Sequence, residues 1–255
     1  MLSKKWTLIF HIFRITVYVF VILCIAFYAF LLYATSSITV NRENFLKGKN
    51  YSKETLLLFS DIAFPDDKIR KWNEDIKVEI ANEDRKVKIP YADLRNKGSI
   101  SEVDSIINIL SPLIYPVKIY RVPQNGNLIV HLNVDSVPIP TKNAQGFCYI
   151  PPLIKTFSWN IKYAEVYNIW YSPVIFHEIL HAIGLQHPSK EYPFYMAIDD
   201  EYTFGSLEEE EKFHTPLYLS EEEKTIIKML YSPYIKSGLS KKEFLKQMKL
   251  QDNDK

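Results

Sequence analysis

Hydrophobic and polar positions divide the chain into one long apolar run near the N-terminus and a series of shorter patterned segments. Residues 15–35 contain no charged side chain, and Lys4, Lys5 and Arg14 precede them. A run of about twenty apolar residues is long enough to cross a bilayer as a helix. We therefore predict a short N-terminal tail at residues 1–14 and a transmembrane signal anchor at residues 15–35.

The competing interpretation of this run is a signal peptide that is removed. Ala34 and Ser36 suit the two small-residue positions before a cleavage site. The run is longer than the roughly 7 to 15 apolar residues usual in a signal peptide, which favours the uncleaved anchor. An anchor with such a short preceding tail usually translocates the rest of the chain. We therefore expect a single-pass membrane protein whose remaining residues lie on the extracytoplasmic side, whereas cleavage would give a secreted protein.

Shorter patterns come after the apolar run. Five segments have the composition of β-strands, and in residues 76–80 apolar and polar positions alternate, as they do in a half-buried strand. These segments are residues 76–80, 117–122, 128–134, 146–150 and 161–167. Three helix starts carry the capping-box pattern, in which a serine precedes a glutamate by three positions. The pairs are Ser99 with Glu102, Ser220 with Glu223, and Ser240 with Glu243. Strands and helices together predict an α+β domain.

Length and composition limit the domain organisation. The chain has 255 residues, of which 47% are hydrophobic and 24% are charged, and this suffices for one domain of about 180 residues. We place that domain at residues 72–235, after a polar stalk or linker at residues 36–71 and before a peripheral C-terminal helix at residues 236–255. The net charge of +1 gives no reason to expect a nucleic-acid partner. The oligomeric state is left open.

One segment combines a helical pattern with reactive side chains. Residues 172–187 read S-P-V-I-F-H-E-I-L-H-A-I-G-L-Q-H and hold three of the six histidines. Serine followed by proline is a favourable helix start. Apolar residues at helical spacing then form a buried stripe, which comprises Phe176, Ile179, Leu180 and Ile183. Gly184 follows this pattern and suits a left-handed turn that ends the helix.

The histidines of this segment have the spacing of metal ligands. His177 and His181 lie four positions apart, so their side chains project from one helix face on successive turns. The turn at Gly184 can bring His187 towards the same point. Three imidazoles leave the fourth tetrahedral position of a zinc ion open, as in catalytic sites. Glu178 would not bind the metal but could take a proton from the attacking water. The pattern indicates one catalytic Zn²⁺ and metal-assisted hydrolysis of an acyl bond.

On these residues the chain resembles the metzincin clan of zinc metalloproteases, with matrixin-like features. The clan signature H-E-x-x-H-x-x-G-x-x-H is matched by His177, Glu178, His181, Gly184 and His187. The resemblance implies a zincin catalytic domain with a mixed, twisted sheet of about five strands, an active-site helix and a C-terminal helix. It also implies a zinc metalloendopeptidase that acts on a peptide or protein substrate.

The resemblance assigns roles to further residues. The clan places a methionine in a tight turn beneath the metal, and Met196 matches this Met-turn position; a plain core methionine is the alternative. Three aromatic residues before it would line the pocket for the substrate side chain that follows the scissile bond: Tyr192, Phe194 and Tyr195. Residues 146–150 would form the edge strand along which an extended peptide pairs.

Two other functions stay open. A non-proteolytic descendant could keep zinc for stability or bind a peptide or protein partner, although an intact Glu178 argues against it. An amidase acting on a non-protein substrate would use the same chemistry. Outside the motif, His131 is interpreted as an ordinary strand histidine and Cys148 as a small buried residue. The acidic residues 208–211 are interpreted as a solvated loop, with calcium binding as the alternative.

Overall fold

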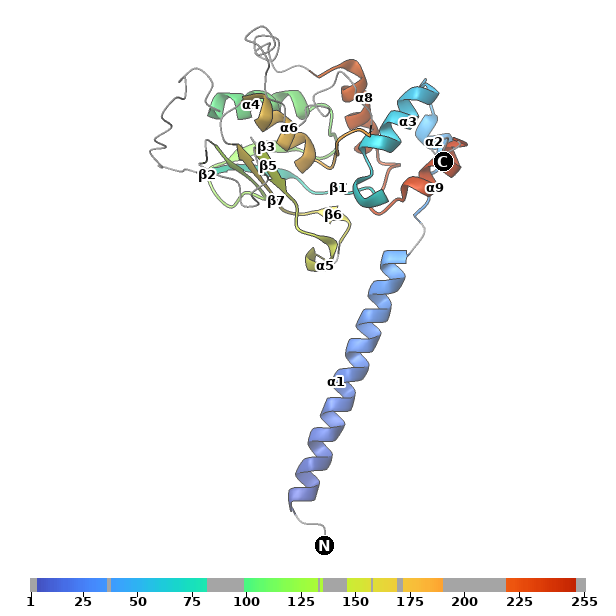
Figure 1. The fold of residues 1–255 in the computed structure, drawn as a ribbon, viewed down its shortest axis with the longest axis vertical. Coiled ribbons are helices and arrows are strands. Elements are labelled where there is room, and N and C mark those ends of the chain that lie inside the picture. Colours follow the sequence, from blue (N-terminus) through green and yellow to red (C-terminus); the bar gives the residue numbers. More distant parts are fainter. Residues whose placement is uncertain are drawn as a thin grey trace. The chain divides into compact units, whose positions relative to one another are not determined.

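The long apolar run forms a single helix, α1 (Lys4–Thr35) (Figure 1). Its segment His11–Ala29 has a mean hydropathy of 2.3 and is long enough to cross a membrane, although a signal sequence would share both properties. The predicted N-terminal apolar helix is confirmed, and the side of the membrane on which the rest lies stays a prediction. The chain separates into two compact units, residues 1–37 and residues 38–255.

The second unit contains a mixed sheet. The structure is a computed structural model that describes residues 4–35, 38–81, 99–132, 134, 146–156, 158–168, 172–189 and 219–250. Five strands lie in the order β3-β2-β4-β7-β5. They are β2 (Ile76–Ala81), β3 (Ile119–Val122), β4 (Leu128–His131), β5 (Gly146–Tyr149) and β7 (Ala164–Asn168). Strands β3, β2, β4 and β7 run parallel, and β5 lies antiparallel to β7 at one edge of the sheet. The predicted α+β fold with five strands is confirmed.

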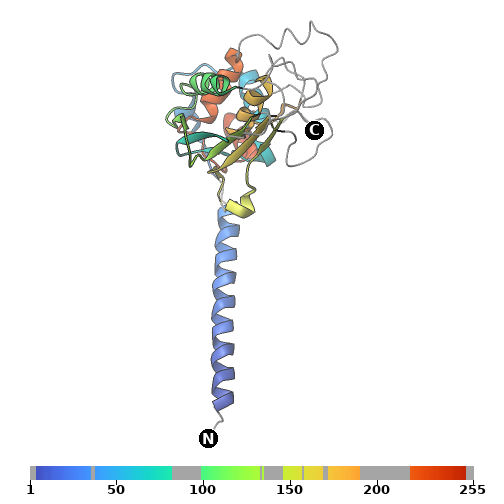
Figure 2. The ribbon, with the colours of Figure 1, turned by 90° about the vertical axis from the view of Figure 1, so that its left-hand side faces the viewer.

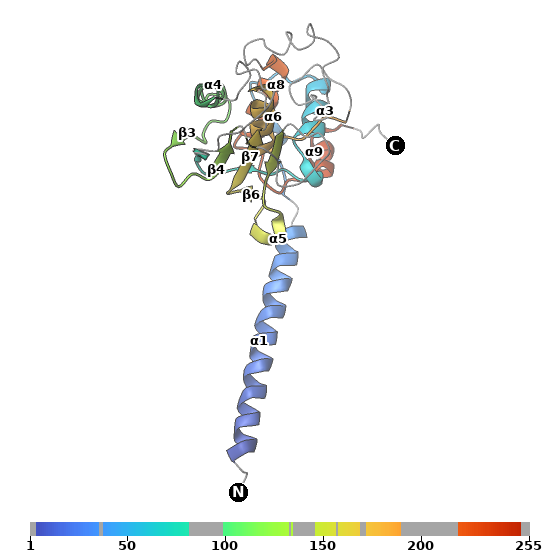
Figure 3. The same cartoon turned by 60° about the vertical axis from the view of Figure 1, so that its left-hand side comes forward.

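Helices cover one face of this sheet. Alternate residues of β2 and β4 are fully buried, among them Ile76, Val78, Leu128 and Val130. Helix α4 (Ile100–Leu110) contacts β3, and α6 (Ser172–Ala182) contacts β5 and β7. Figures 2 and 3 show the two helices above the strands from two directions. The strand alternation therefore arises because one sheet face supplies the core.

Two strands that follow each other in sequence do not pair. β3 and β4 lie on opposite sides of β2, and both run parallel to it. The connection passes very close to β2, since a Cβ atom on Gly126 would lie 2.5 Å from Cβ of Glu79. The Glu79 carboxylate accepts a hydrogen bond from the Gly126 amide at 2.8 Å. A glycine at this position therefore permits the crossing.

The expected stalk at residues 36–71 is wrong for its described part. Residues 42–46, 53–62 and 65–67 form α2 (Arg42–Leu46), α3 (Lys53–Ile62) and the 3₁₀ helix η1 (Pro65–Asp67). Phe45, Phe59, Ile62 and Phe64 are buried in the core. Next, β1 (Lys71–Trp72) pairs in parallel with β6 (Asn160–Ile161). The polar residues that suggested a stalk cover the solvent side of short helices whose apolar side is buried.

The C-terminal segment is also part of the core. Helices α8 (Glu221–Leu230) and α9 (Lys241–Met248) both contact α3. The ring centroid of Phe244 in α9 lies 5.1 Å from that of Phe59 and 5.5 Å from that of Phe64. The expectation of a peripheral helix within residues 236–255 is therefore wrong for α9. The short helix α5 (Leu153–Thr156) completes the described elements.

The predicted helix starts are confirmed. Full capping boxes are present at Ser99 with Glu102 and at Ser220 with Glu223, where each side chain accepts a hydrogen bond from the partner's backbone. Ser240 accepts from the amide of Glu243 and so also satisfies a backbone donor that a helix leaves without an intrahelical partner.

Candidate metal centre

Helix α6 holds two of the three histidines in fixed positions. Its predicted apolar stripe is buried and packs the helix against the core. The stripe comprises Phe176, Ile179, Leu180 and Ile183. This leaves His177 and His181 on a neighbouring face, with their Nε2 atoms 3.0 Å apart. The predicted helix and its stripe are thus confirmed.

The turn after α6 brings the third histidine to the same point. Gly184 has φ +107°, a left-handed conformation that glycine adopts without steric cost. The amide of Gln186 then donates to the carbonyl of Ile62 at 2.8 Å, which fixes the returning chain. As a result, Nε2 of His187 lies 2.9 Å from Nε2 of His177 and 2.9 Å from Nε2 of His181. The predicted convergence of the three histidines is confirmed.

Side chains distant in sequence support the end of α6. The indole of Trp72 donates to the carbonyl of Ala182 at 2.8 Å, and the hydroxyl of Tyr231 donates to the carbonyl of Ile183 at 3.0 Å. Both bonds satisfy carbonyls that a helix leaves without an intrahelical donor. Burial raises the pKa of Tyr231 strongly, so its hydroxyl keeps the proton that it donates. Strand β1 and the C-cap residue of α8, Tyr231, therefore position the turn that carries His187.

A hydrogen bond to the backbone orients the ring of His181. Its Nδ1 lies 2.9 Å from the carbonyl oxygen of Leu185, and since a carbonyl only accepts, Nδ1 carries the proton. In a neutral imidazole the other nitrogen is then a lone-pair acceptor. Burial, together with the neighbouring His177, lowers the pKa of His181 to about 3. Nε2 of His181 is therefore free of a proton and directed towards the other two rings, as in metal-bound histidines.

The three residues fit a metal ion. The three ring nitrogens lie within 4.8 Å of one another. Because Nε2 of His181 can only accept, hydrogen bonds among the rings cannot satisfy all three nitrogens at once. In a tetrahedral zinc site with bonds of about 2.0 to 2.1 Å, neighbouring nitrogens would lie about 3.3 Å apart. The observed 2.9 to 3.0 Å differs from this by a few tenths of an ångström. The cluster can hold a metal with small side-chain adjustments.

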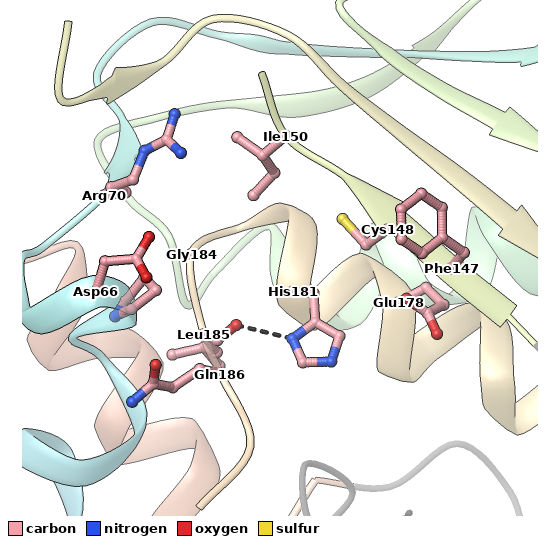
Figure 4. Close-up of a pocket in the computed structure, with 11 residues that line it drawn as sticks. Asp66, Arg70, Phe147, Cys148, Ile150, Glu178, His181, Gly184, Leu185 and Gln186 are labelled. Atoms are coloured by element: carbon pink, nitrogen blue, oxygen red, sulfur yellow. Dashed lines mark hydrogen bonds between the residues drawn. The ribbon is translucent and has the colours of Figure 1, made fainter. Parts of the chain in front are cut away.

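Glu178 lies beside this cluster and is 2% exposed. It reaches a cavity that His181 also lines (Figure 4). Strand β5 packs closely against α6 here, since a Cβ atom on Gly146 would lie 2.3 Å from Cγ1 of Val174 and 2.8 Å from Oε1 of Glu178. The absence of a side chain at Gly146 therefore sets how near the edge strand comes to Glu178.

The cavity has a volume of about 360 Å³, within the range of small-ligand pockets. Its wall includes residues from β5 and the segment after it, among them Cys148, Phe147 and Ile150. Burial, together with the Glu178 carboxylate, raises the pKa of the Cys148 thiol, so this thiol is protonated near neutral pH. Within the described residues, the group of possible metal ligands contains the three histidines and not Cys148.

Sequence reasoning missed the opposite wall. Asp66 and Arg70 line the cavity from the segment after α3, a segment that the sequence analysis assigned to the stalk. Gln186 also lines it. No local pattern marks Arg70, because its place in the cavity depends on contacts with residues more than 80 positions away, such as the carbonyl of Pro151.

Several predicted site residues lie outside the described residues. These are the Met-turn candidate Met196 and the three aromatic residues of the expected substrate pocket, Tyr192, Phe194 and Tyr195. The acidic residues 208–211 also lie outside them. His131 is described: its ring stacks on Tyr167 at a centroid distance of 4.3 Å, and its Nε2 lies 3.6 Å from the Glu165 carboxylate.

Comparisons with known proteins add no family to this description. No model of a protein family matches the chain, and no curated protein matches its sequence.

Proposed function

We propose that the chain is a zinc-dependent endopeptidase of the metzincin type, anchored in a membrane by α1. One observation supports this most strongly: the Nε2 atoms of three histidines converge within 3.0 Å next to a buried glutamate. Three imidazoles suit zinc among other transition metals. A structural zinc site is usually closed by a fourth protein ligand, and none is present among the described residues.

In this proposal His177, His181 and His187 hold the zinc ion. When bound, zinc lowers the pKa of a water molecule to about 7 and polarises a substrate carbonyl. Glu178 takes the proton of the attacking water and gives it to the leaving amine, as general base and then general acid. Its burial keeps bulk water from competing for that proton. Its position in the cavity wall supports this role, because a substrate group in the cavity would lie beside it.

The edge strand suggests how a peptide binds. β5 pairs on one side with β7, and no other described strand pairs with it. An extended peptide that pairs with β5 would form main-chain hydrogen bonds and pass over the cavity that contains Glu178 and His181. This arrangement suits a peptide or protein substrate better than a small amide. The short tail before α1 supports an uncleaved anchor with hydrolysis on the extracytoplasmic side.

The proposal is tested with the full chain in detergent. Zinc content and cleavage of a mixed peptide library are measured for the wild type, Glu178→Gln and His181→Ala. We expect one zinc per chain in the wild type and in Glu178→Gln, but cleavage only by the wild type. His181→Ala should lose both zinc and cleavage, because only two imidazole ligands remain. Glu165→Gln, a change in the β7 glutamate beside His131, is the matched control and should retain zinc and cleavage.

The outcomes separate the candidate functions. Full activity of Glu178→Gln would remove Glu178 from the mechanism. Zinc binding without cleavage by any form would favour a non-proteolytic binding module or an amidase with a non-protein substrate. A wild-type chain that binds no zinc would contradict the proposal as a whole.

A further inference from the structure

The cavity beside the metal centre contains charged groups that the proposed chemistry does not use. His181 and Glu178 line one side of it, and Arg70 and Asp66 line the other. Figure 4 shows these two sides facing each other across the space below Ile150. A substrate group that enters this cavity therefore lies between the hydrolytic residues and an arginine.

Arg70 is held firmly relative to α6. Its carbonyl oxygen lies so near the turn after α6 that a Cβ atom on Gly184 would be 2.0 Å from it. The neighbouring Ile69 exchanges backbone hydrogen bonds with Gly238 and Leu239 at 2.8 and 2.9 Å. The guanidinium itself donates from Nη2 to the carbonyl oxygen of Pro151 at 2.8 Å. Backbone and side chain are thus fixed before any substrate binds.

The guanidinium also has unused hydrogen-bonding capacity. Its Nε is buried and has no hydrogen-bond partner, and an arginine offers five N–H donors in a planar fork. Burial lowers the pKa of Arg70 and the charge of Asp66 opposes this, so the group stays charged at any physiological pH. No hydrogen bond joins Arg70 to Asp66 among the residues that Figure 4 draws.

We propose that Arg70 is a specificity-determining residue that binds a carboxylate of the peptide substrate close to the scissile bond. The inference rests on the proposed peptidase function and adds the substrate class to it. A planar guanidinium forms two parallel hydrogen bonds with a carboxylate, and a buried donor without a partner disfavours ligands that cannot fill it. An aspartate or glutamate side chain and a free C-terminus both supply this group, and the experiment distinguishes them.

The test uses the full chain in detergent, loaded with zinc, and matched peptides. Each pair differs by glutamate or glutamine at one position near the cleaved bond, and each peptide is made with a free and an amidated C-terminus. For the wild type we expect kcat/KM to be about ten- to a hundredfold higher with the carboxylate. A preference for glutamate identifies the side chain as the source, and a preference for the free terminus identifies the C-terminus.

Three substitutions of Arg70 separate recognition from structure. Arg70→Gln should abolish the preference, mainly through KM. Arg70→Lys keeps the positive charge but loses the planar arrangement of donors. This variant should keep part of the carboxylate preference. Arg70→Glu should shift the preference to peptides with lysine at the same position, an effect that mere loosening of the fold cannot produce. Arg121→Gln is the matched control, because Arg121 pairs with Asp104 at 2.8 Å and does not line the cavity.

A binding measurement keeps this inference distinct from the proposed function. The Kd of each peptide pair is measured on Glu178→Gln protein with and without Arg70→Gln, so that no cleavage is needed. A carboxylate preference in Kd that Arg70→Gln removes supports the inference even if the wild type cleaves nothing. Equal Kd and kcat/KM for the two members of each pair, or a preference that persists in Arg70→Gln with its zinc content intact, would overturn it.

Discussion

Gly184 and Arg70 approach each other so closely that no side chain fits at the glycine. A Cβ atom there would lie 2.0 Å from the carbonyl oxygen of Arg70, well inside any van der Waals contact. The contact joins the turn after α6, which leads to His187, to the segment that carries Arg70 into the cavity. Gly184 therefore determines the positions of both His187 and the cavity wall that contains Arg70.

Gly184→Ala should therefore disturb both stability and metal binding. The left-handed φ of +107° costs a residue with a side chain about 1 to 3 kcal/mol, and the collision with Arg70 adds to this. The free energy of unfolding is measured in urea and zinc affinity by competition with a chelator. We expect both to fall.

Gly48→Ala is the matched control for this substitution. Gly48 has φ +67° with nothing within 4 Å of an added Cβ, so it has backbone strain without a collision. Its zinc affinity should equal that of the wild type. A Gly184→Ala protein no less stable than Gly48→Ala, with unchanged zinc affinity, would show that the close contact does not position the turn.

Lys71 should give the protein a characteristic stability change at alkaline pH. Its side chain is 8% exposed, and its Nζ donates to the carbonyls of Leu230 and Ser232 at 2.8 and 3.2 Å. Burial lowers the pKa of its amine to about 8, whereas in the unfolded chain it is about 10.4. Between these values the unfolded chain binds one proton more than the folded chain, so the free energy of unfolding rises with pH.

Lys71→Met removes this titration. The free energy of unfolding of the wild type, minus that of Lys71→Met, should grow by about 2 kcal/mol between about pH 7.5 and 9.5. Urea unfolding at several pH values measures it, and the subtraction cancels other groups that titrate. The exposed Lys77 of β2 provides the control. The free energy of unfolding of Lys77→Met should depend on pH in the same way as that of the wild type. A difference that stays flat with pH would contradict the lowered pKa.

Phe244→Ala tests whether α9 belongs to the core. Phe244 is fully buried and contacts Phe59 and Phe64. Truncation of a buried phenylalanine costs about 3 to 5 kcal/mol, so urea unfolding should show a loss of that size. The exposed Lys242 of the same helix gives the control Lys242→Ala, with an expected change within about 0.5 kcal/mol. A similarly small effect of Phe244→Ala would restore the interpretation of a peripheral helix.

Sequence patterns were most informative where the physics is local. The spacing of His177 and His181, the buried stripe of α6 and the capping box at Ser99 all depend on neighbours within one or two helical turns. Such contacts follow from the geometry of a helix, whatever surrounds it. The alternation in residues 76–80 likewise predicted a strand. These features were therefore visible without a fold.

Sequence patterns did not predict those elements whose structure depends on residues far along the chain. The local pattern of residues 53–62 does not distinguish a stalk from a core helix, and the packing of Phe59 against Phe244 decides this. The order of segments 117–122 and 128–134 along the chain did not reveal that β2 lies between β3 and β4, because strand pairing is set by the whole sheet. Local polarity cannot report contacts with residues that lie far along the chain.

By itself, then, the sequence determined that two histidines and a glutamate project from one helix and that a glycine turn comes next. Tertiary structure decided that His187 returns to within 2.9 Å of the other two histidines and that Arg70 reaches the same cavity. The reason is that both depend on contacts between remote segments, such as the hydrogen bond from the indole of Trp72 to the carbonyl of Ala182, 110 positions apart. Chain folding, and not spacing, completes the site.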